Sequence, residues 1–292
     1  MAAYSLDSQM KPVMHVSLNE KFSLKTVNAF GSEINNEEEL NQLIATGKHH
    51  PLSGPIYIKG VRSGDCIEVN ILDIIPNKIG YQCLSRSSGF IKCNPFSRKF
   101  CKISFENGQI EYNGLVLQAK PSIGAVGTAS KEKTRSGRTG KNGGNLDLHE
   151  ISVNSKLILP CDYDGGLLYF GDMHLLQNNG EVSGIAAETG GSIVASVNIS
   201  EYRFDFPVLY TDEDVIIIGY GNNIEEALKT ATCNACCYIS RQYLIEYMDA
   251  YMLLGIIGSV VLGHATGAVV SCGIKIFNEH LLRLKEKKIG TI

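Results

Sequence analysis

The chain lacks several features that would assign it at once to a common class of protein. With 27 basic and 30 acidic residues its formal net charge is −3, so no basic excess indicates a general nucleic-acid binder. The N-terminus has no basic segment followed by an apolar run, which argues against a secretory signal. Its nine cysteines are an odd number without the spacing of a small disulfide-bonded domain. We therefore expect free thiols and a cytoplasmic location.

Two widespread catalytic motifs are missing as well. There is no Gly-x-Ser-x-Gly turn and no Gly-x-x-x-x-Gly-Lys loop, so neither a serine triad nor a nucleotide-driven mechanism is expected. Cys233, Cys236 and Cys237 lie close together, but no second pair of cysteines or histidines follows at zinc spacing. We interpret these three residues as small side chains packed on a helix.

The composition is that of a globular protein, with 44% hydrophobic and 20% charged residues in 292. Short apolar and β-branched runs, separated by Gly, Asn, Pro and Ser, predict strands along most of the chain. The predicted strands are 15–18, 22–27, 56–59, 66–74, 99–105, 109–113, 156–159, 167–170, 185–188, 192–199 and 215–220. Between two of them, Asn107-Gly108 is a strong signal for a two-residue hairpin. The regular short spacing predicts a mainly β protein of stacked antiparallel sheets.

Two or three helices are expected, mostly near the C-terminus. Residues 36–45 form one candidate, and Asn223 to Met248 form the clearest, with Asn223 as its N-cap. Asp249 is expected to cap the next helix, and the basic run from 284 to 288 is expected to be a solvated tail. We expect a single domain, 1–292, in which residues 223–292 could form a helical subregion.

One segment is long and apolar enough to resemble a membrane span. Tyr251 to Phe277 is almost free of charge, but it contains five glycines, a histidine and several serines. Its first part has the pattern of a helix, and its second part alternates like a strand. We therefore expect a buried helix-turn-strand unit and no membrane partner.

Side chains with oxygen and nitrogen ligand atoms are concentrated in two short segments, 142–147 and 171–181. Asp172 and His174 are separated by one residue, so in an extended strand both side chains project from the same face. They can converge on one ion, and a remote carboxylate such as Asp147 could complete the set. A carboxylate and imidazole site with an open position is suited to activating water for hydrolysis. The alternative is a buried, hydrogen-bonded Asp-His pair with no metal.

These segments resemble the acetamidase/formamidase family of amide hydrolases. The resemblance rests on the order and spacing of motifs spread over most of the chain. They are Asn28-Ala-Phe-Gly31, Gly54-Pro-Ile-Tyr-Ile-Lys-Gly60, Gly64-Asp65, Gly143-Gly-Asn-Leu-Asp147, Gly171-Asp-Met-His174, Asn179-Gly-Glu181 and Asp249-Ala-Tyr-Met-Leu-Leu254. The resemblance implies a β-rich protein that cleaves simple amides to a carboxylate and ammonia, and that carries a divalent metal.

The sequence also departs from the pattern of that family. Asn28, Asn142 and Ser259 stand where Asp, His and Asp are expected, and each replaces a group that could ionise or bind metal. His50 and His264 stand where Asn and Gln are expected. A non-catalytic β-rich binding protein that kept the amidase framework is therefore the competing interpretation.

Within the resemblance, Asp147, Asp172 and His174 are the expected metal ligands, and the imidazole favours zinc over calcium. Gly144 and Asn145 lie in a turn-prone segment that could hold the substrate carbonyl, or could be an ordinary Gly-Gly turn. These three ligands and this segment form the core of the predicted site.

Two glutamates are candidates for moving a proton to the leaving nitrogen. Glu188 lies within an apolar strand, where a carboxylate needs a partner or an elevated pKa; it could equally be a structural partner of a lysine. Glu181 follows Asn179-Gly180. If that pair closed an ideal hairpin, Glu181 would lie roughly 13 Å from His174. Glu181 is therefore assigned from the resemblance, and it can reach the site only if residues 175–178 turn back.

A basic loop, 131–141, leads directly into the predicted site with five cations and one acid. Such a run is ordinarily a solvated surface loop, but as a lid it would favour an anionic amide. From the resemblance and the predicted site together, we predict a homo-oligomeric amidase that hydrolyses a linear carboxamide with metal-activated water.

Overall fold

The computed structural model describes residues 2–84, 89–91 and 99–289. Its helices are α1 (Glu37–Thr46), α2 (Ile224–Tyr243), α3 (Tyr247–Ile257) and α4 (Asn278–Ile289). Its strands are β1 (Met14–Val16), β2 (Phe22–Thr26), β3 (Leu52–Ile58), β4 (Cys66–Leu84), β5 (Lys99–Glu106), β6 (Gln109–Tyr112), β7 (Leu115–Gln118), β8 (Ser122–Thr128), β9 (Thr139–Gly140), β10 (Gly143–Asn145), β11 (Lys156–Pro160), β12 (Leu168–His174), β13 (Glu188–Ile199), β14 (Val208–Tyr210), β15 (Asp214–Gly221), β16 (Gly258–Leu262) and β17 (Val270–Phe277). The expected mainly β, antiparallel fold is confirmed.

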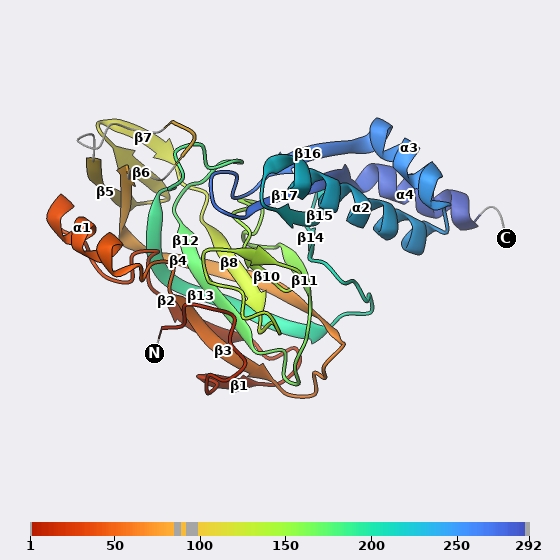
Figure 1. Cartoon of the computed structure of the whole chain (residues 1–292), viewed down its shortest axis with the longest axis horizontal. Helices are drawn as coiled ribbons and strands as arrows, with labels where there is room; N and C mark the ends of the chain where they lie inside the picture. The colour runs from red at the N-terminus through yellow and green to blue at the C-terminus, as the bar shows by residue number, and fades with distance from the viewer. Residues whose placement is uncertain (1, 85–88, 92–98, 290–292) are drawn as a thin grey trace.

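The body of the molecule is a curled sheet built around two long strands (Figure 1). β4 and β13 pair antiparallel from Tyr81 opposite Glu188 to Ile67 opposite Ile199, with two register shifts between. β13 also pairs with β12, which in turn pairs with β8 and β3. β8 and β12 are buried along their whole lengths, so their polar side chains need partners inside the protein. This buried layer carries the predicted site.

A second layer is formed by β14, β15, β17 and β16, and α2 covers it. Ala227, Ala231 and Ala235 recur every four residues on the buried face of α2. A Cβ on Gly219 of β15 would collide with the backbone of Ala231. Small residues on both elements therefore permit the close contact between helix and sheet.

The long predicted helix is interrupted, and its capping differs in part from our expectation. Asn223 caps α2 as predicted, since its side chain accepts a hydrogen bond from the Glu226 N–H. The helix ends where Leu244 adopts a left-handed conformation with φ 58°. Glu246, and not Asp249, caps α3, because the Glu246 carboxylate accepts hydrogen bonds from the N–H groups of Met248 and Asp249. The basic run from 284 to 288 is also not a tail, because it belongs to α4.

The long apolar segment is a helix followed by a β-hairpin. α3 leads directly into β16, which pairs antiparallel with β17, so one strand more is present than in the expected helix-turn-strand unit. Only Ala250 and Leu254 of α3 are buried, so the expected burial of the helix was wrong. Within the described residues, no helix has both the length and the apolar character needed to cross a membrane.

The Asn107-Gly108 turn connects β5 and β6. Glu106 pairs with Gln109 across Asn107-Gly108, and both turn residues have positive φ. The predicted hairpin is confirmed, because this turn type requires two residues that tolerate the left-handed region.

Candidate active site

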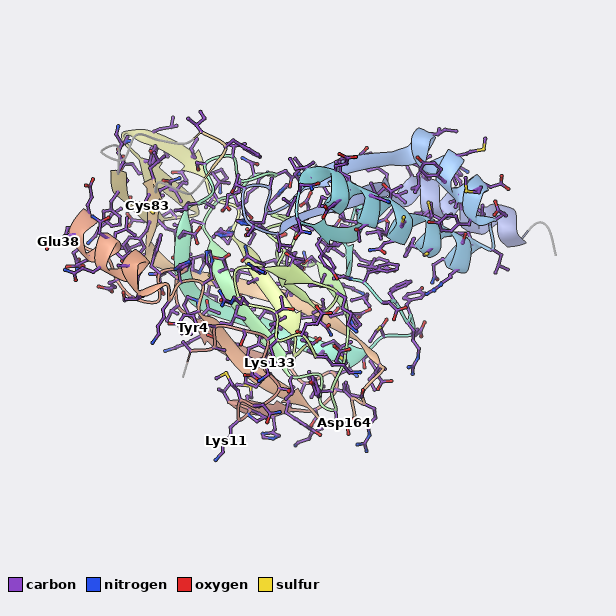
Figure 2. The ribbon with its side chains drawn as sticks, viewed as in Figure 1. Tyr4, Lys11, Glu38, Cys83, Lys133 and Asp164 are labelled. Atoms are coloured by element: carbon purple, nitrogen blue, oxygen red, sulfur yellow. The ribbon has the colours of Figure 1, made fainter. Side chains whose placement is uncertain are left out.

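Ionisable side chains from distant segments converge beside a cavity of about 410 Å³. The cavity is lined by imidazoles and carboxylates and also by apolar side chains. Its polar lining comprises His49, His50, Asp172, Glu181, Glu188 and His264, and its apolar lining includes Ala29, Phe30, Leu43, Cys83 and Ile185. Cys83, near α1 in Figure 2, lies on β4 at this cavity. A lining of this mixed kind suits a small molecule that has both a polar group and an apolar part.

Asp172 and His174 meet at the end of β12, as predicted from their spacing. His174 Nε2 lies 3.8 Å from Asp172 Oδ1, and both side chains are almost fully buried. The strand is not regular here, because Asp172 adopts φ 56°. A Cβ on Gly124 of the neighbouring β8 would lie 2.7 Å from His174 Cε1, so a glycine is needed beside the pair. The role of Gly124 was missed from the sequence.

Asp147 completes the predicted ligand set from the segment after β10. Its Oδ1 lies 3.9 Å from His174 Nε2, and its side chain is 1% exposed. The Asn145 amide donates to Asp147 Oδ2 at 2.6 Å, and the Gln177 amide donates to Oδ1 at 3.2 Å. Two buried donors therefore orient this carboxylate. Gly144 lies in β10 and, like Asn145, is not among the residues that line the cavity.

The two predicted glutamates reach the site by different routes. Glu188 begins β13 directly opposite His174, and its Oε1 lies 3.4 Å from His174 Nε2. Asn179-Gly180 does not close a strand hairpin, so the distance of roughly 13 Å estimated from one does not apply. Gly180 instead donates its N–H to the carbonyl of Leu262 at 2.7 Å, and Glu181 turns inward, where its carboxylate accepts from Gln177.

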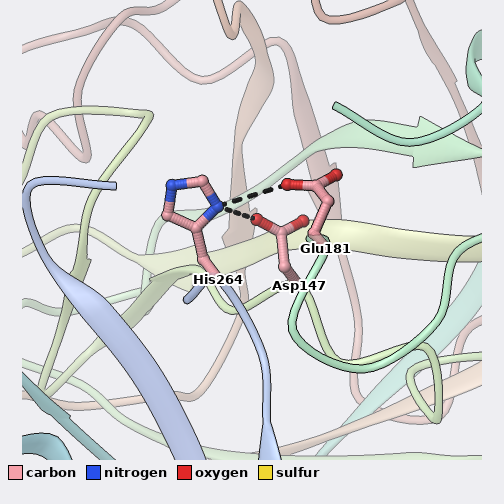
Figure 3. A group of neighbouring side chains, drawn as sticks. All are labelled: Asp147, Glu181 and His264. Atoms are coloured by element: carbon pink, nitrogen blue, oxygen red, sulfur yellow. Dashed lines mark ion pairs between the residues drawn. The ribbon is translucent and has the colours of Figure 1, made fainter. Parts of the chain in front are cut away.

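His50 and His264 join the cluster, and neither was assigned to the site from sequence. His264 Nδ1 lies 2.9 Å from Asp147 Oδ2 and 3.4 Å from Glu181 Oε2 (Figure 3). His50 Nδ1 lies 3.4 Å from Asp172 Oδ1. The one available signal was that both histidines depart from the family pattern. Their distance in sequence from the other site residues concealed where they would lie.

The carboxylates and imidazoles shift each other's pKa strongly in the metal-free protein. Burial lowers the pKa of His50 and His264, but the facing carboxylates outweigh it and raise the two values to about 9 and about 10. Burial raises the pKa of Glu188 to about 7, with the Asp172 charge adding to the rise and His174 opposing it. Burial also raises the pKa of Glu181, and the charge of Asp147 adds to this.

The atoms present fit a divalent cation. Within the described residues, three overlapping groups of ligand atoms each lie within 4.8 Å of one another. They are Asp147-Asp172-His174, His174-Glu181-Glu188 and Asp147-Glu181-His264. Both nitrogens of His174, Oδ1 of Asp172 and Oε2 of Glu188 are buried without a hydrogen-bond partner in the described structure. Unsatisfied buried donors and acceptors of this kind are costly unless an ion or water binds them. None of the three groups contains a cysteine.

Comparison with known proteins gives the affiliation of the chain. The sequence profile of the Acetamidase/Formamidase family matches residues 6–130 and 115–273. The chain belongs to this family. A proposed formamidase of Schizosaccharomyces pombe is 31% identical over 145 residues, which are 49% of this chain and 34% of that protein. The matched region thus spans about a third of the length of that relative.

Solved structures of acetamidases share the fold of this acetamidase/formamidase family member. An acetamidase from Bacillus halodurans superposes with a TM-score of 0.92 at 27% identity, covering 97% of each chain. An acetamidase from Yersinia enterocolitica gives 0.89 at 26% identity, covering 96% of this chain and 89% of the other. A gamma lactamase from Delftia acidovorans, at 18% identity and a TM-score of 0.63, shares the fold alone.

The three polar departures from the family pattern lie outside the ionisable cluster. Asn28 makes a local turn, accepting from the Phe30 N–H and donating to the Ser32 carbonyl. Asn142 is buried and donates to the Pro160 carbonyl at 3.1 Å. Ser259 is exposed on β16. None of them belongs to the three ligand groups, so the ligand atoms are present in spite of these departures.

Proposed function

We propose that this acetamidase/formamidase family member hydrolyses a linear carboxamide to a carboxylate and ammonia. One observation carries the proposal: five side chains predicted for this chemistry converge beside a cavity that an amide can enter. They are Asp147, Asp172, His174, Glu181 and Glu188. Membership of an amidase family supports the same reaction.

Asp147, Asp172 and His174 would hold a divalent ion, and the imidazole favours zinc over calcium. Bound there, the ion would supply Lewis acidity and lower the pKa of water toward neutrality. His50 lies against Asp172, and the Asn145 and Gln177 amides hold Asp147, so the ligands are oriented from outside the group. That Gly144 or Asn145 binds the substrate carbonyl directly stays a prediction.

Glu188 is the better placed of the two glutamates for proton transfer. It lines the cavity, and its pKa of about 7 allows it to accept and return a proton near neutral pH. In the proposed reaction it takes a proton from the attacking water and delivers it to the leaving nitrogen. Glu181 lines the same cavity and is the alternative carrier of that proton.

Ammonia release over a panel of amides, before and after chelation, tests the proposal. We expect turnover of at least one short amide, loss on chelation, and recovery when zinc is returned. The competing class is a β-rich binding protein without catalysis. Saturable amide binding with no ammonia release from the metal-loaded protein would support that class and contradict ours.

The preference for an anionic amide is a separate proposal. The cations of the 131–141 loop do not line the site cavity; several of them line another one, beside the start of α2. Lys133 pairs with Asp7 and Lys141 with Asp162, and Figure 2 places Lys133 well away from Cys83. Any preference for an anionic amide would therefore act through the long-range electrostatic potential of the loop cations. Neutralising Arg135 and Arg138 should lower efficiency toward an anionic amide and leave acetamide nearly unchanged.

A homo-oligomeric state, a cytoplasmic location and the absence of nucleic-acid partners stay predictions. The eight cysteines in the described part of the chain are free, which agrees with the expected thiol state. For assembly, the exposed apolar face of α3 is the surface that we propose to be covered by a second copy.

A further inference from the structure

We infer that the amide hydrolysed at this site carries an apolar acyl group larger than acetyl, and that an acyl pocket binds this group. The acyl pocket consists of four side chains that line the cavity, Phe30, Leu43, Cys83 and Ile185. The inference rests on the proposed function and adds the class of substrate to it.

The four side chains of the acyl pocket belong to one apolar cluster. Phe30 and Cys83 are buried members of this cluster, and Leu43 and Ile185 pack against it. Leu43 lies on α1, and Figure 2 shows Cys83 near that helix. The cavity therefore borders a continuous apolar surface that a single acyl group can cover.

Strand pairing places the acyl pocket beside the proposed proton carrier. Glu188 pairs with Tyr81 of β4, so these two side chains project from the same face of the sheet. Cys83 follows Tyr81 by two residues and projects from that face as well. Burial and the nearby Glu188 charge raise the pKa of the Cys83 thiol to about 12, which agrees with this placement. The thiol is therefore neutral and serves as an apolar wall of the pocket.

Hydrogen bonds fix Ile185 close to Glu188. The Gln82 side-chain amide donates to the Ile185 carbonyl at 2.9 Å, and the Ala186 N–H donates to Glu188 Oε1 at 3.1 Å. The segment from 185 to 188 is thus tied both to β4 and to the carboxylate. An acyl group in contact with Ile185 can therefore keep its carboxamide in the same cavity, beside Glu188.

The volume of the cavity exceeds what acetamide needs. One water takes up about 30 Å³ of the liquid, so acetamide, with four heavy atoms, needs on the order of 100 Å³. The cavity measures about 410 Å³. Acetamide would leave most of the acyl pocket in contact with water. A larger apolar acyl group would cover this surface, and the gain grows with the apolar area removed from water.

The first experiment compares kcat/KM for formamide, acetamide, butyramide and isovaleramide. All four amides are neutral, so the cations of the 131–141 loop do not bias the comparison. We expect kcat/KM for isovaleramide to exceed that for acetamide by at least about 10-fold, because each methylene bound in an apolar pocket contributes roughly that factor or more. Equal efficiency toward the two amides, or a preference for acetamide, overturns the inference.

Two substitutions test whether the named side chains select the acyl group. Leu43→Ala and Ile185→Ala should each lower the ratio of kcat/KM for isovaleramide to that for acetamide by roughly 10-fold. This ratio does not depend on how much of the protein is folded. Leu228→Ala is the matched control, because Leu228 is a partly buried helical leucine that packs against another apolar cluster and does not line the cavity. A ratio that both substitutions leave unchanged overturns the inference.

Binding separates a failure of this inference from a failure of the proposed function. In zinc-loaded Glu188→Gln, which lacks the proposed proton carrier, an NMR titration should give a Kd for isovaleramide at least about 10-fold below that for acetamide. This difference without hydrolysis of any amide by the unaltered protein would contradict the proposed reaction and leave the acyl pocket supported. Equal Kd values overturn the acyl pocket, whether or not acetamide is hydrolysed.

Discussion

His174 faces three carboxylates of the ionisable cluster. Its Nε2 lies within 4 Å of Asp147, Asp172 and Glu188, and the ring is fully buried. We expect His174→Ala to lower kcat/KM by at least about 100-fold, because it removes a proposed metal ligand and leaves three carboxylates without the imidazole that faces them. Ammonia release and circular dichroism, measured on the same preparation, test this. Full activity with an unchanged fold would show that His174 is structural only.

Gly124 provides the space that this cluster needs. A Cβ there would lie 2.5 Å from Asp147 Oδ1 and 2.7 Å from His174 Cε1, inside van der Waals contact. Gly124→Ala should therefore displace two ligands and weaken zinc affinity by roughly 10–100-fold. Zinc competition against a chromophoric chelator measures the change. Unchanged affinity would mean that neither side chain binds the ion.

Metal affinity should rise with pH, because protons and cations compete for the same buried cluster. In the metal-free protein His50 and His264 have pKa values raised to about 9 and about 10. Both are therefore protonated near neutrality, and a cation bound to the carboxylates that face them would lower their pKa and release these protons. Zinc affinity should rise about tenfold per pH unit for each proton displaced, from pH 6 to 8, and more gently in His264→Gln. The same competition assay at several pH values is the test; a flat profile would show that the cation does not bind the carboxylates that face these histidines.

At the scale of elements, the contact between β15 and α2 depends on one missing side chain. A Cβ on Gly219 would meet the backbone nitrogen and Cα of Ala231, and neither can move without shifting the helix. We expect Gly219→Ala to lower the free energy of unfolding by about 1–3 kcal/mol. Urea denaturation provides the measurement.

Gly255 is the matched control for that substitution. It lies within α3, and a Cβ there would meet nothing within 4 Å. Gly255→Ala should therefore stabilise the protein by up to about 1 kcal/mol, through helix propensity alone. If the two substitutions shift stability equally, the close packing of α2 on β15 is not what limits position 219.

At the scale of the whole molecule, one surface is unusually apolar for a protein that stays monomeric. Met252 and Ile256 on α3 are 72% and 82% exposed, and Val260 on the adjoining edge strand β16 is 56% exposed. In the described structure β16 pairs only with β17, so its other edge is open. An apolar face beside an open strand edge is suited to a self-complementary contact between two copies.

Met252→Glu together with Ile256→Glu should therefore convert an oligomer to monomers, because two buried charges at such an interface cost several kcal/mol. Analytical ultracentrifugation measures the change. Leu115→Glu, on the exposed strand β7, is the control and should leave the mass unaltered. A monomeric unaltered protein would contradict the predicted homo-oligomer.

Features that depend on neighbouring residues were determined by the sequence alone. The Asn223 cap and the Asn107-Gly108 hairpin follow from backbone geometry over a few residues, and the spacing of Asp172 and His174 predicted that they would meet, although the strand is not regular at Asp172. The family motifs identified the β-rich class and brought Asp147 into the expected ligand set. In each case the interaction is short in sequence, or the motif is shared with relatives of the same fold.

Only the tertiary structure showed that His50 and His264 join the site, and how Glu181, expected from the family motif, reaches it. His50 follows α1, His264 follows β16, and Glu181 lies in the connection after β12, so no local pattern relates them. Their convergence depends on the curl of the sheet and on the Gly180 to Leu262 hydrogen bond, which turns Glu181 inward. Long-range strand pairing sets those positions. The sequence thus predicted that Asp147, Asp172 and His174 would meet, and the packing of remote strands brings the other side chains of the cluster to them.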